Sequence, residues 1–327
     1  KGGWTNREVI KWFSEYAAVC ATRFGDRVRN WMVLNEPMVF TGAGYFLGVH
    51  APGKKGLRRL LPAIHHTTMS QAEGGRVLRE ILPIGSQIGT TFSSSYVTPY
   101  TDTERDIKAT KRVDTLLNRL FLEPAIGMGY PVNGLRVLRR IEKYIKGNDE
   151  NMMAFDFDFI GLQLYTREVI RYSFLTPFIQ ARIVPAHTRK VYHTSMNWEV
   201  YPEALYKMIQ RLDKYENIKS IIITENGAAF HDQVTEQGVN DTERVQYIGH
   251  HIEQVMKARK EGAKVNGYFV WSLTDNFEWQ EGFAPRFGLI YVDYKTQERI
   301  IKDSGFAYQR LIKTYDPRPQ KVLSSGI

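Results

Sequence analysis

The chain has 327 residues and a formal net charge of +9, and its composition is 43% hydrophobic, 13% aromatic and 24% charged. This composition is typical of a globular protein with a substantial core, and it excludes disordered and collagen-like chains. No apolar stretch reaches the roughly 20 residues needed to cross a bilayer, so we expect no membrane partner.

Cysteine content and charge narrow the class further. Cys20 is the only cysteine, which excludes an intrachain disulfide and a cysteine-based metal site. The first residues, KGGWTNREVI, lack the pattern of a signal peptide, and we expect a cytoplasmic protein. The densest basic run, KKGLRR at residues 54–59, has no nucleic-acid motif around it. We interpret that run as a solvated loop and expect no nucleic-acid partner.

Helices and strands are predicted to alternate along the chain. A capping box, TNRE at residues 5–8, predicts a helix that ends near Phe24, and an apolar run predicts a strand over residues 27–37. A helix over 70–82 and a strand over 87–93 follow, and then a helix over 111–126 and a strand over 158–166. The pattern continues with a helix over 201–215, a strand over 220–226, a helix over 241–262 and a strand over 266–273.

This alternation predicts an α/β protein with a parallel sheet. The strands are almost continuously apolar, as expected for parallel strands covered on both faces. No linker or change of composition interrupts the order, which favours a single domain over residues 1–327. A doubly wound sheet and a (β/α)₈ barrel both fit. The barrel is favoured because side chains capable of chemistry follow four of the five strands, where barrel active sites are built. They are Asn35 and Glu36, Gln163 and Tyr165, Thr224, Glu225 and Asn226, and Trp271.

Two glutamates stand out among these side chains. Glu36 and Glu225 each directly follow an apolar run, and each has an asparagine next to it, although they are 189 positions apart. Either glutamate alone is equally well explained as a helix cap or a solvated loop acid. Together, at the convergent ends of barrel strands, they form the pair of carboxylates that glycoside hydrolysis requires.

The segment WSLTDNFEWQEGFAPRFGL, residues 271–289, combines aromatic and acidic side chains after the last predicted strand. Aromatic rings stack on the apolar faces of sugars, and carboxylates accept hydrogen bonds from sugar hydroxyls. A hydrophobic cluster beneath a long loop is the alternative for Phe277, Phe283 and Phe287. It explains Glu278 beside Trp279 poorly, so we predict a carbohydrate subsite here.

The motifs NEP (residues 35–37), ITENG (223–227) and WSLTDNFEWQEGFAPRFGLIYVDY (271–294) resemble the signatures of glycoside hydrolase family 1. That family comprises retaining β-glucosidases and their relatives on a (β/α)₈ barrel. The resemblance extends over essentially the whole chain and includes GWTNREVIKWFSEYA, APG and DFIGLQLYT. It implies that Glu36 is the general acid/base and Glu225 the nucleophile, with their carboxyl groups roughly 5–5.5 Å apart.

The resemblance also implies which residues contact the substrate. They are Asn35 at the 2-hydroxyl, Gln163, Tyr165 as the hydrogen-bond partner of the nucleophile, Trp271 under the sugar ring, Glu278 and Trp279 at the distant hydroxyls, and Phe287. Gln163 stands where the family usually has asparagine, and Val33 stands where it usually has threonine. We expect no cofactor and no metal, since the His-His pairs at residues 65–66 and 250–251 lie on helical patterns where adjacent side chains do not share a face.

The implied activity is hydrolysis of terminal β-D-glucosides, with β-galactosides or β-fucosides as further substrates. A 6-phospho-β-glycosidase of the same family is the runner-up, but Glu278 would repel the phosphate. In the family, three βα units precede the NEP strand, so this chain is expected to hold about five of eight units. A homo-oligomer or an additional N-terminal segment would then complete the barrel, and a non-catalytic sugar-binding protein is the alternative from another class. The sequence leaves the preferred sugar and aglycone open.

Overall fold

The computed structural model describes residues 1–315, which fall in two compact units. Lys1–Asn226 and His251–Phe269 form the first unit, and Gly227–His250 and the described residues from Val270 onward form the second. The single domain over residues 1–327 therefore stays a prediction. None of the helices within residues 1–315 has both the length and the apolar character needed to cross a bilayer.

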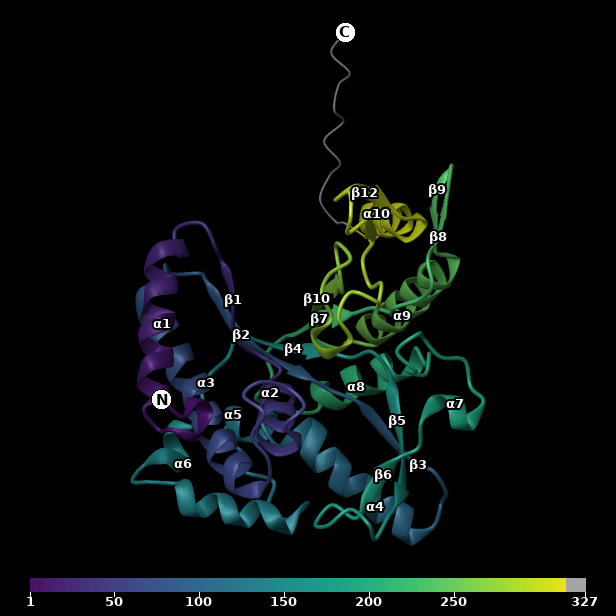
Figure 1. Ribbon diagram of the computed structural model, residues 1–327. Helices are drawn as coiled ribbons and strands as arrows, with labels where there is room; N and C mark the ends of the chain where they lie inside the picture. Colours follow the sequence, from purple (N-terminus) through teal and green to yellow (C-terminus); the bar gives the residue numbers. More distant parts are fainter. Residues whose placement is uncertain (316–327) are drawn as a thin grey trace. The chain divides into compact units, whose positions relative to one another are not determined.

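A five-stranded sheet forms the centre of the first unit (Figure 1). Its strand order is β1-β2-β4-β7-β10, and each pair from β1 to β7 is parallel. The strands are β1 (Asn30–Asn35), β2 (Gln87–Ser93), β4 (Phe159–Gln163), β7 (Ile221–Asn226) and β10 (Val265–Val270). All five predicted strands are confirmed, and they lie in the order in which they occur along the chain.

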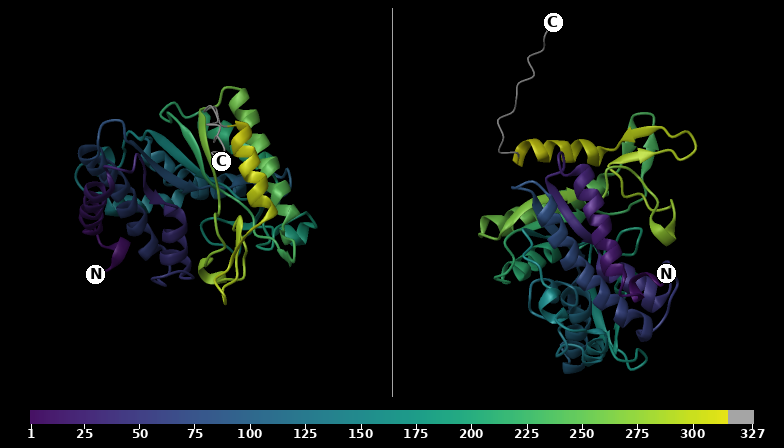
Figure 2. Two further views of the ribbon diagram at one scale, coloured as in Figure 1. Left: turned by 90° about the horizontal axis from the view of Figure 1, so that it is seen from above. Right: turned by 90° about the vertical axis from the view of Figure 1, so that its left-hand side faces the viewer.

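Helices follow or precede each strand of this sheet. The α-helices among the described residues are α1 (Val9–Phe24), α2 (Pro37–Thr41), α3 (Leu57–Ile81), α4 (Glu104–Asp114), α5 (Leu122–Ala125), α6 (Asp149–Met152), α7 (Ala186–Arg189), α8 (Glu203–Asp213), α9 (Thr242–Lys260) and α10 (Asp303–Tyr315). Helix α1 packs along α3, which Figure 2 shows as adjacent purple and blue helices. Apolar side chains of α3, α8 and the strands, such as Ile64, Leu205 and Leu162, share one buried core cluster.

Shorter turns and strands complete the described chain. The additional helical turns are η1 (Gly3–Thr5), η2 (Gly42–Leu47), η3 (Thr115–Arg119), η4 (Arg136–Tyr144) and η5 (Trp279–Glu281). The first unit has a second sheet of order β3-β5-β6, formed by β3 (Tyr96–Pro99), β5 (Arg167–Tyr172) and β6 (Ala181–Ile183). The second unit has two small antiparallel pairs, β8 (Gln233–Thr235) with β9 (Gly238–Asn240) and β11 (Ile290–Val292) with β12 (Arg299–Ile301).

The capping box and two details of the predicted helices differ from the structure, although the helix predicted over residues 70–82 is present. The capping box does not form: the hydroxyl of Thr5 donates to the carbonyl of Gly2, and α1 begins only at Val9. The helix predicted over residues 70–82 is the second half of α3, which also includes Leu57, Arg58 and Arg59 of the basic run. The helix predicted over 111–126 is divided between α4, the π-helical turn η3 and α5.

A buried polar cluster joins the N-terminal segment to α3. His65 Nε2 lies 2.9 Å from Asp149 Oδ2, and Arg7 pairs with the same carboxylate at 2.5 Å. His66 Nδ1 lies 3.0 Å from the carbonyl oxygen of Trp4. Burial lowers the pKa of His66 from its ordinary 6.5 to about 4. Burial alone would raise the pKa of Asp149, but hydrogen bonds from Arg7 and His65 outweigh it and hold that pKa well below its usual range.

Candidate active site

Glu36 lies at a sharp turn between β1 and α2. Strand β1 ends at Asn35, and Glu36 adopts a left-handed backbone conformation with φ 46° and ψ 60°. A non-glycine residue there costs about 1–3 kcal/mol and persists only when its surroundings hold it. The amide of Glu36 donates to the carbonyl of Thr91 on β2 at 3.1 Å, and Pro37 occupies the first turn of α2, where its missing N–H is not needed. The Asn-Glu-Pro order therefore ends the strand and fixes the acid at its tip.

Glu225 lies at the end of β7, where two side chains from the neighbouring strand segment hold its carboxylate. The phenol of Tyr165 donates to Oε2 at 2.5 Å, and the amide of Gln163 donates to Oε1 at 2.6 Å. Gln163 is the register partner of Glu225 in the β4/β7 pair. Two donors, one on each oxygen, stabilise the ionised carboxylate and fix its plane.

Asn35 belongs to the same group of side chains. The amide nitrogen of Gln163 also donates to Asn35 Oδ1 at 2.7 Å. Strand β2 lies between β1 and β4 in the sheet, so the Gln163 side chain reaches past it. The structure thus brings together Asn35, Gln163, Tyr165 and Glu225 from three strand ends, as the sequence predicted. The predicted separation of the Glu36 and Glu225 carboxyl groups stays a prediction.

Trp198, which sequence reasoning missed, packs beside the site. Its ring centroid lies 5.2 Å from that of Tyr165, at an interplanar angle of 49°. The next residue, Glu199, is 4% exposed and pairs with Arg167 at 2.8 Å and with Arg189 at 2.7 Å. Burial alone would raise the pKa of Glu199, but hydrogen bonds from both arginines outweigh it and lower that pKa. These ion pairs anchor the loop that carries Trp198.

The second unit holds the remaining predicted residues, Trp271, Glu278, Trp279 and Phe287. Burial raises the pKa of Glu278, while a hydrogen bond with the indole of Trp271 opposes the rise. Trp279 is 71% exposed, in a left-handed conformation with φ 42°. Phe287 is 2% exposed, which favours the alternative interpretation of this ring as part of the loop's hydrophobic packing.

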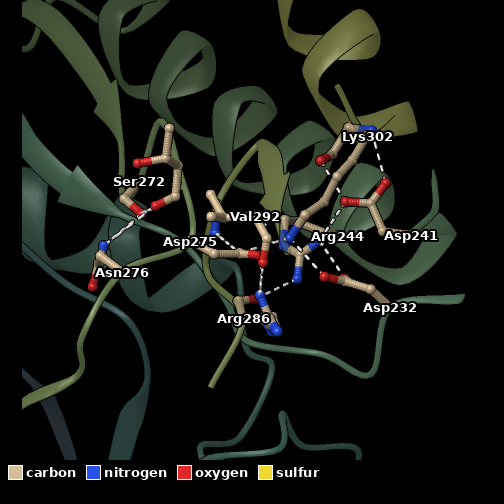
Figure 3. Close-up of polar contacts among 12 residues, drawn as sticks. Asp232, Asp241, Arg244, Ser272, Asp275, Asn276, Arg286, Val292 and Lys302 are labelled. Atoms are coloured by element: carbon tan, nitrogen blue, oxygen red, sulfur yellow. Dashed lines mark hydrogen bonds and ion pairs between the residues drawn. The ribbon is translucent and has the colours of Figure 1, made fainter. Parts of the chain in front are cut away.

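A buried network of opposite charges supports the segment that follows Trp271 (Figure 3). Lys302 pairs with Asp232 at 2.6 Å and with Asp275 at 2.8 Å, and Arg286 pairs with the second oxygen of Asp275 at 3.0 Å. Arg244, which is fully buried, pairs with Asp232 at 2.9 Å and with Asp241. Asp275 also accepts the amide of Gly288, so one carboxylate ties the two ends of this aromatic segment together.

Within residues 1–315, no group of three or more His, Cys, Asp and Glu side chains has an arrangement that could hold a metal ion. The side chains that meet at the strand ends supply a carboxylate, two amides and a phenol. Paired carboxylates at strand ends, one of them bonded by a phenol, fit acid/base and nucleophilic work on a polar substrate.

Comparisons with known proteins agree with this chemistry. A family model described as "Glycosyl hydrolase family 1" matches residues 1–317. The 1,4-beta-D-glucan glucohydrolase of Thermotoga neapolitana is 42% identical over 318 residues, which are 96% of this chain and 70% of the relative. A bifunctional beta-D-glucosidase/beta-D-fucosidase of Bifidobacterium breve is 33% identical over 97% of this chain and 71% of its own.

Among solved structures, a family 1 β-glucosidase from Thermotoga maritima superposes with a TM-score of 0.89 at 40% identity. The match covers 96% of this chain and 70% of that structure. Such neighbours are (β/α)₈ barrels, and the likeness confirms the predicted fold class, to which the described residues contribute a five-stranded sheet.

Proposed function

This chain belongs to glycosyl hydrolase family 1 and is a glycoside hydrolase, and we propose that it cleaves terminal β-D-glucosides with retention of configuration. One observation carries the assignment of roles. Glu225 is held by two donors, Tyr165 at 2.5 Å and Gln163 at 2.6 Å, at a strand end, as suits a carboxylate that must stay ionised and aligned. Glu36 follows the neighbouring Asn35 at another strand end of the same sheet.

The proposed reaction has two steps. Glu225 attacks the anomeric carbon as the bond to the leaving oxygen breaks, and Glu36 gives its proton to that oxygen. Glu36, now ionised, removes a proton from water, which attacks the anomeric carbon and displaces Glu225 from the sugar. Each step inverts the configuration, so the released sugar keeps the original one, and Glu36 ends the cycle protonated.

The substrate class is proposed from the relatives and from the second unit. Two relatives are a beta-glucosidase and a bifunctional beta-D-glucosidase/beta-D-fucosidase. Trp271 and Glu278, which are hydrogen-bonded to each other, and the exposed Trp279 offer ring faces and a carboxylate to a neutral sugar. A 6-phosphoglucoside is disfavoured because Glu278 would repel its phosphate.

The test is release of nitrophenol from 4-nitrophenyl β-D-glucoside by this chain and by Glu225→Gln and Glu36→Gln. We expect the Glu225 variant to lose at least a thousandfold in kcat, and proton NMR of the wild-type reaction to show the β-anomer forming first. Glu203→Gln, an exposed glutamate on α8, is the matched control and should behave as wild type. Initial appearance of the α-anomer, or faster turnover of the 6-phospho substrate, would contradict the proposal.

We further propose that the sheet edges of the first unit are covered by additional polypeptide, either a second copy of this chain or further barrel units. Strands β1 and β10 end the five-stranded sheet, and Met32 on β1 and Phe269 on β10 are 53% and 60% exposed. Unpaired edges with apolar side chains favour association. Light scattering after size exclusion should find a dimer or larger species, and a strict monomer would exclude the second-copy form.

We also propose the cytoplasm as the compartment. Cys20 is a free cysteine and the only one in the sequence, so nothing in the chain requires oxidising conditions. Fractionation of the source cells tests this proposal, and recovery of the protein outside the cell would contradict it.

A further inference from the structure

Gln163 makes two contacts that join the proposed nucleophile to another strand end. The side chain is buried, with 1% of the residue exposed. Its amide nitrogen donates to Glu225 Oε1 at 2.6 Å and to Asn35 Oδ1 at 2.7 Å, which uses both of its hydrogens. Its amide oxygen is buried and has no hydrogen-bond partner among the described residues.

These contacts fix the direction of two amides. An ionised carboxylate only accepts hydrogen bonds, so the nitrogen of Gln163, and not its oxygen, faces Glu225. The same nitrogen then requires the oxygen of Asn35, which turns the Asn35 amide nitrogen away from Gln163. A buried acceptor without a partner destabilises the conformation that leaves it unpaired. Because the Gln163 oxygen bears that cost, the nitrogen contacts determine the orientation.

Side-chain length matters for this bridge. Asn35 is on β1 and Gln163 ends β4, and β2 lies between these strands. An asparagine at position 163 would be one methylene shorter, so it would not span both contacts from the same backbone position. The bridge is thus a specific consequence of glutamine at this position.

We propose that Gln163 is a positioning residue that couples the charge of Glu225 to the orientation of Asn35, and through it to the sugar hydroxyl that Asn35 meets. This inference rests on the proposed function. When Glu225 is ionised, Gln163 is held by it and presents its nitrogen to Asn35, whose own nitrogen then points toward the substrate. When Glu225 loses its charge in the covalent intermediate, its hydrogen bond with Gln163 weakens, and the constraint that Gln163 places on the Asn35 amide weakens with it.

The kinetic test is a double-mutant cycle with Gln163→Met, Asn35→Ala and both together. Methionine has a similar volume and cannot make either hydrogen bond. On 4-nitrophenyl β-D-glucoside we expect each single variant to lose about 10- to 100-fold in kcat/KM, and the double variant to lose at least tenfold less than the product of the two. On the 2-deoxy analogue the Asn35→Ala loss should shrink to the part that acts through Gln163, and the Gln163→Met loss should shrink to the part that acts through Glu225. Gln71→Met, at a buried glutamine of α3, is the control and should leave the Asn35→Ala loss unchanged.

A spectroscopic readout separates this inference from the proposed function. With asparagine labelled by ¹⁵N, the side-chain amide of Asn35 should shift as Glu225 titrates. That shift should disappear in Gln163→Met and in Glu225→Gln, whether or not the protein turns over a substrate. The coupling would be overturned if the Asn35 resonance titrated equally in Gln163→Met. It would also be overturned if the kcat/KM losses of the two single variants multiplied in the double variant on both substrates. An inactive wild type with the titration intact would refute only the proposed function.

Discussion

Acid should destabilise this protein through protonation of the buried His66. His66 is 5% exposed and its pKa is about 4, whereas an unfolded chain would have a histidine pKa of about 6.5. Because the folded pKa is lowered, the stability that neutral His66 contributes is complete above pH 6.5 and falls as the pH decreases toward 4. The full difference corresponds to about 3 kcal/mol, and screening by nearby solvent reduces the loss expected between pH 7 and pH 5 to about 1–2 kcal/mol.

The assay is urea unfolding followed by circular dichroism at pH 7, 6 and 5, for the wild type and for His66→Gln. Glutamine keeps a donor for the Trp4 carbonyl but does not titrate. The variant should be less stable at pH 7, and its unfolding free energy should fall about 1–2 kcal/mol less than that of the wild type on going to pH 5. Equal losses in both proteins would refute the reasoning, because they would place the acid sensitivity elsewhere. His65, whose pKa is also lowered by burial, remains in both proteins and so cancels in this comparison.

Three further outcomes follow from the site and its supports. Tyr165→Phe removes a hydrogen bond to the charged Glu225 worth about 1.5–3 kcal/mol, so kcat/KM should fall about 10- to 100-fold. Because that bond stabilises the ionised carboxylate, the acid limb of the pH–rate profile should move to higher pH. In Glu278→Gln the KM should be about tenfold higher than in the wild type at neutral pH. The KM of the wild type should rise in acid, because Glu278 is protonated below its raised pKa, whereas the KM of the variant should not rise in this way. Arg244→Met removes the buried cation beside Asp241 and leaves Asp232 with Lys302 as its charged partner. The variant should lose about 3–5 kcal/mol of unfolding free energy, and an unchanged melting temperature would contradict this prediction.

The central sheet could be predicted because its strands carry a strong local signal. Each is a short, almost continuously apolar run, and parallel strands bury both faces. The convergence of Asn35, Gln163 and Glu225 followed from the parallel order, since the carboxyl ends of such strands lie at one edge. The hydrogen bond from Gln163 to Asn35 could not be predicted from a local pattern, because it depends on how far the Gln163 side chain reaches past β2.

The supports of the site were missed for a physical reason. Trp198 lies in the segment TSMNWEV, which has neither helical nor strand periodicity. Its position beside Tyr165 depends on the ion pair between Glu199 and Arg167, which are 32 positions apart. A single sequence does not show which distant charged residues pair. The capping box failed for a similar reason. The side chain of Asn6 accepts the amide of Glu8 at 3.0 Å and takes over the role assigned to Thr5.

The two proposed catalytic carboxylates have different tasks, and each lies at a strand end where a described feature fixes its position. A nucleophile must keep its charge and its alignment, and Glu225 has a donor on each oxygen from side chains on the adjoining strand segment. A general acid/base must lose and regain a proton in every cycle. The backbone of Glu36 is fixed by a left-handed turn between the end of β1 and Pro37. Backbone strain can fix where a carboxyl stands without favouring either of its protonation states.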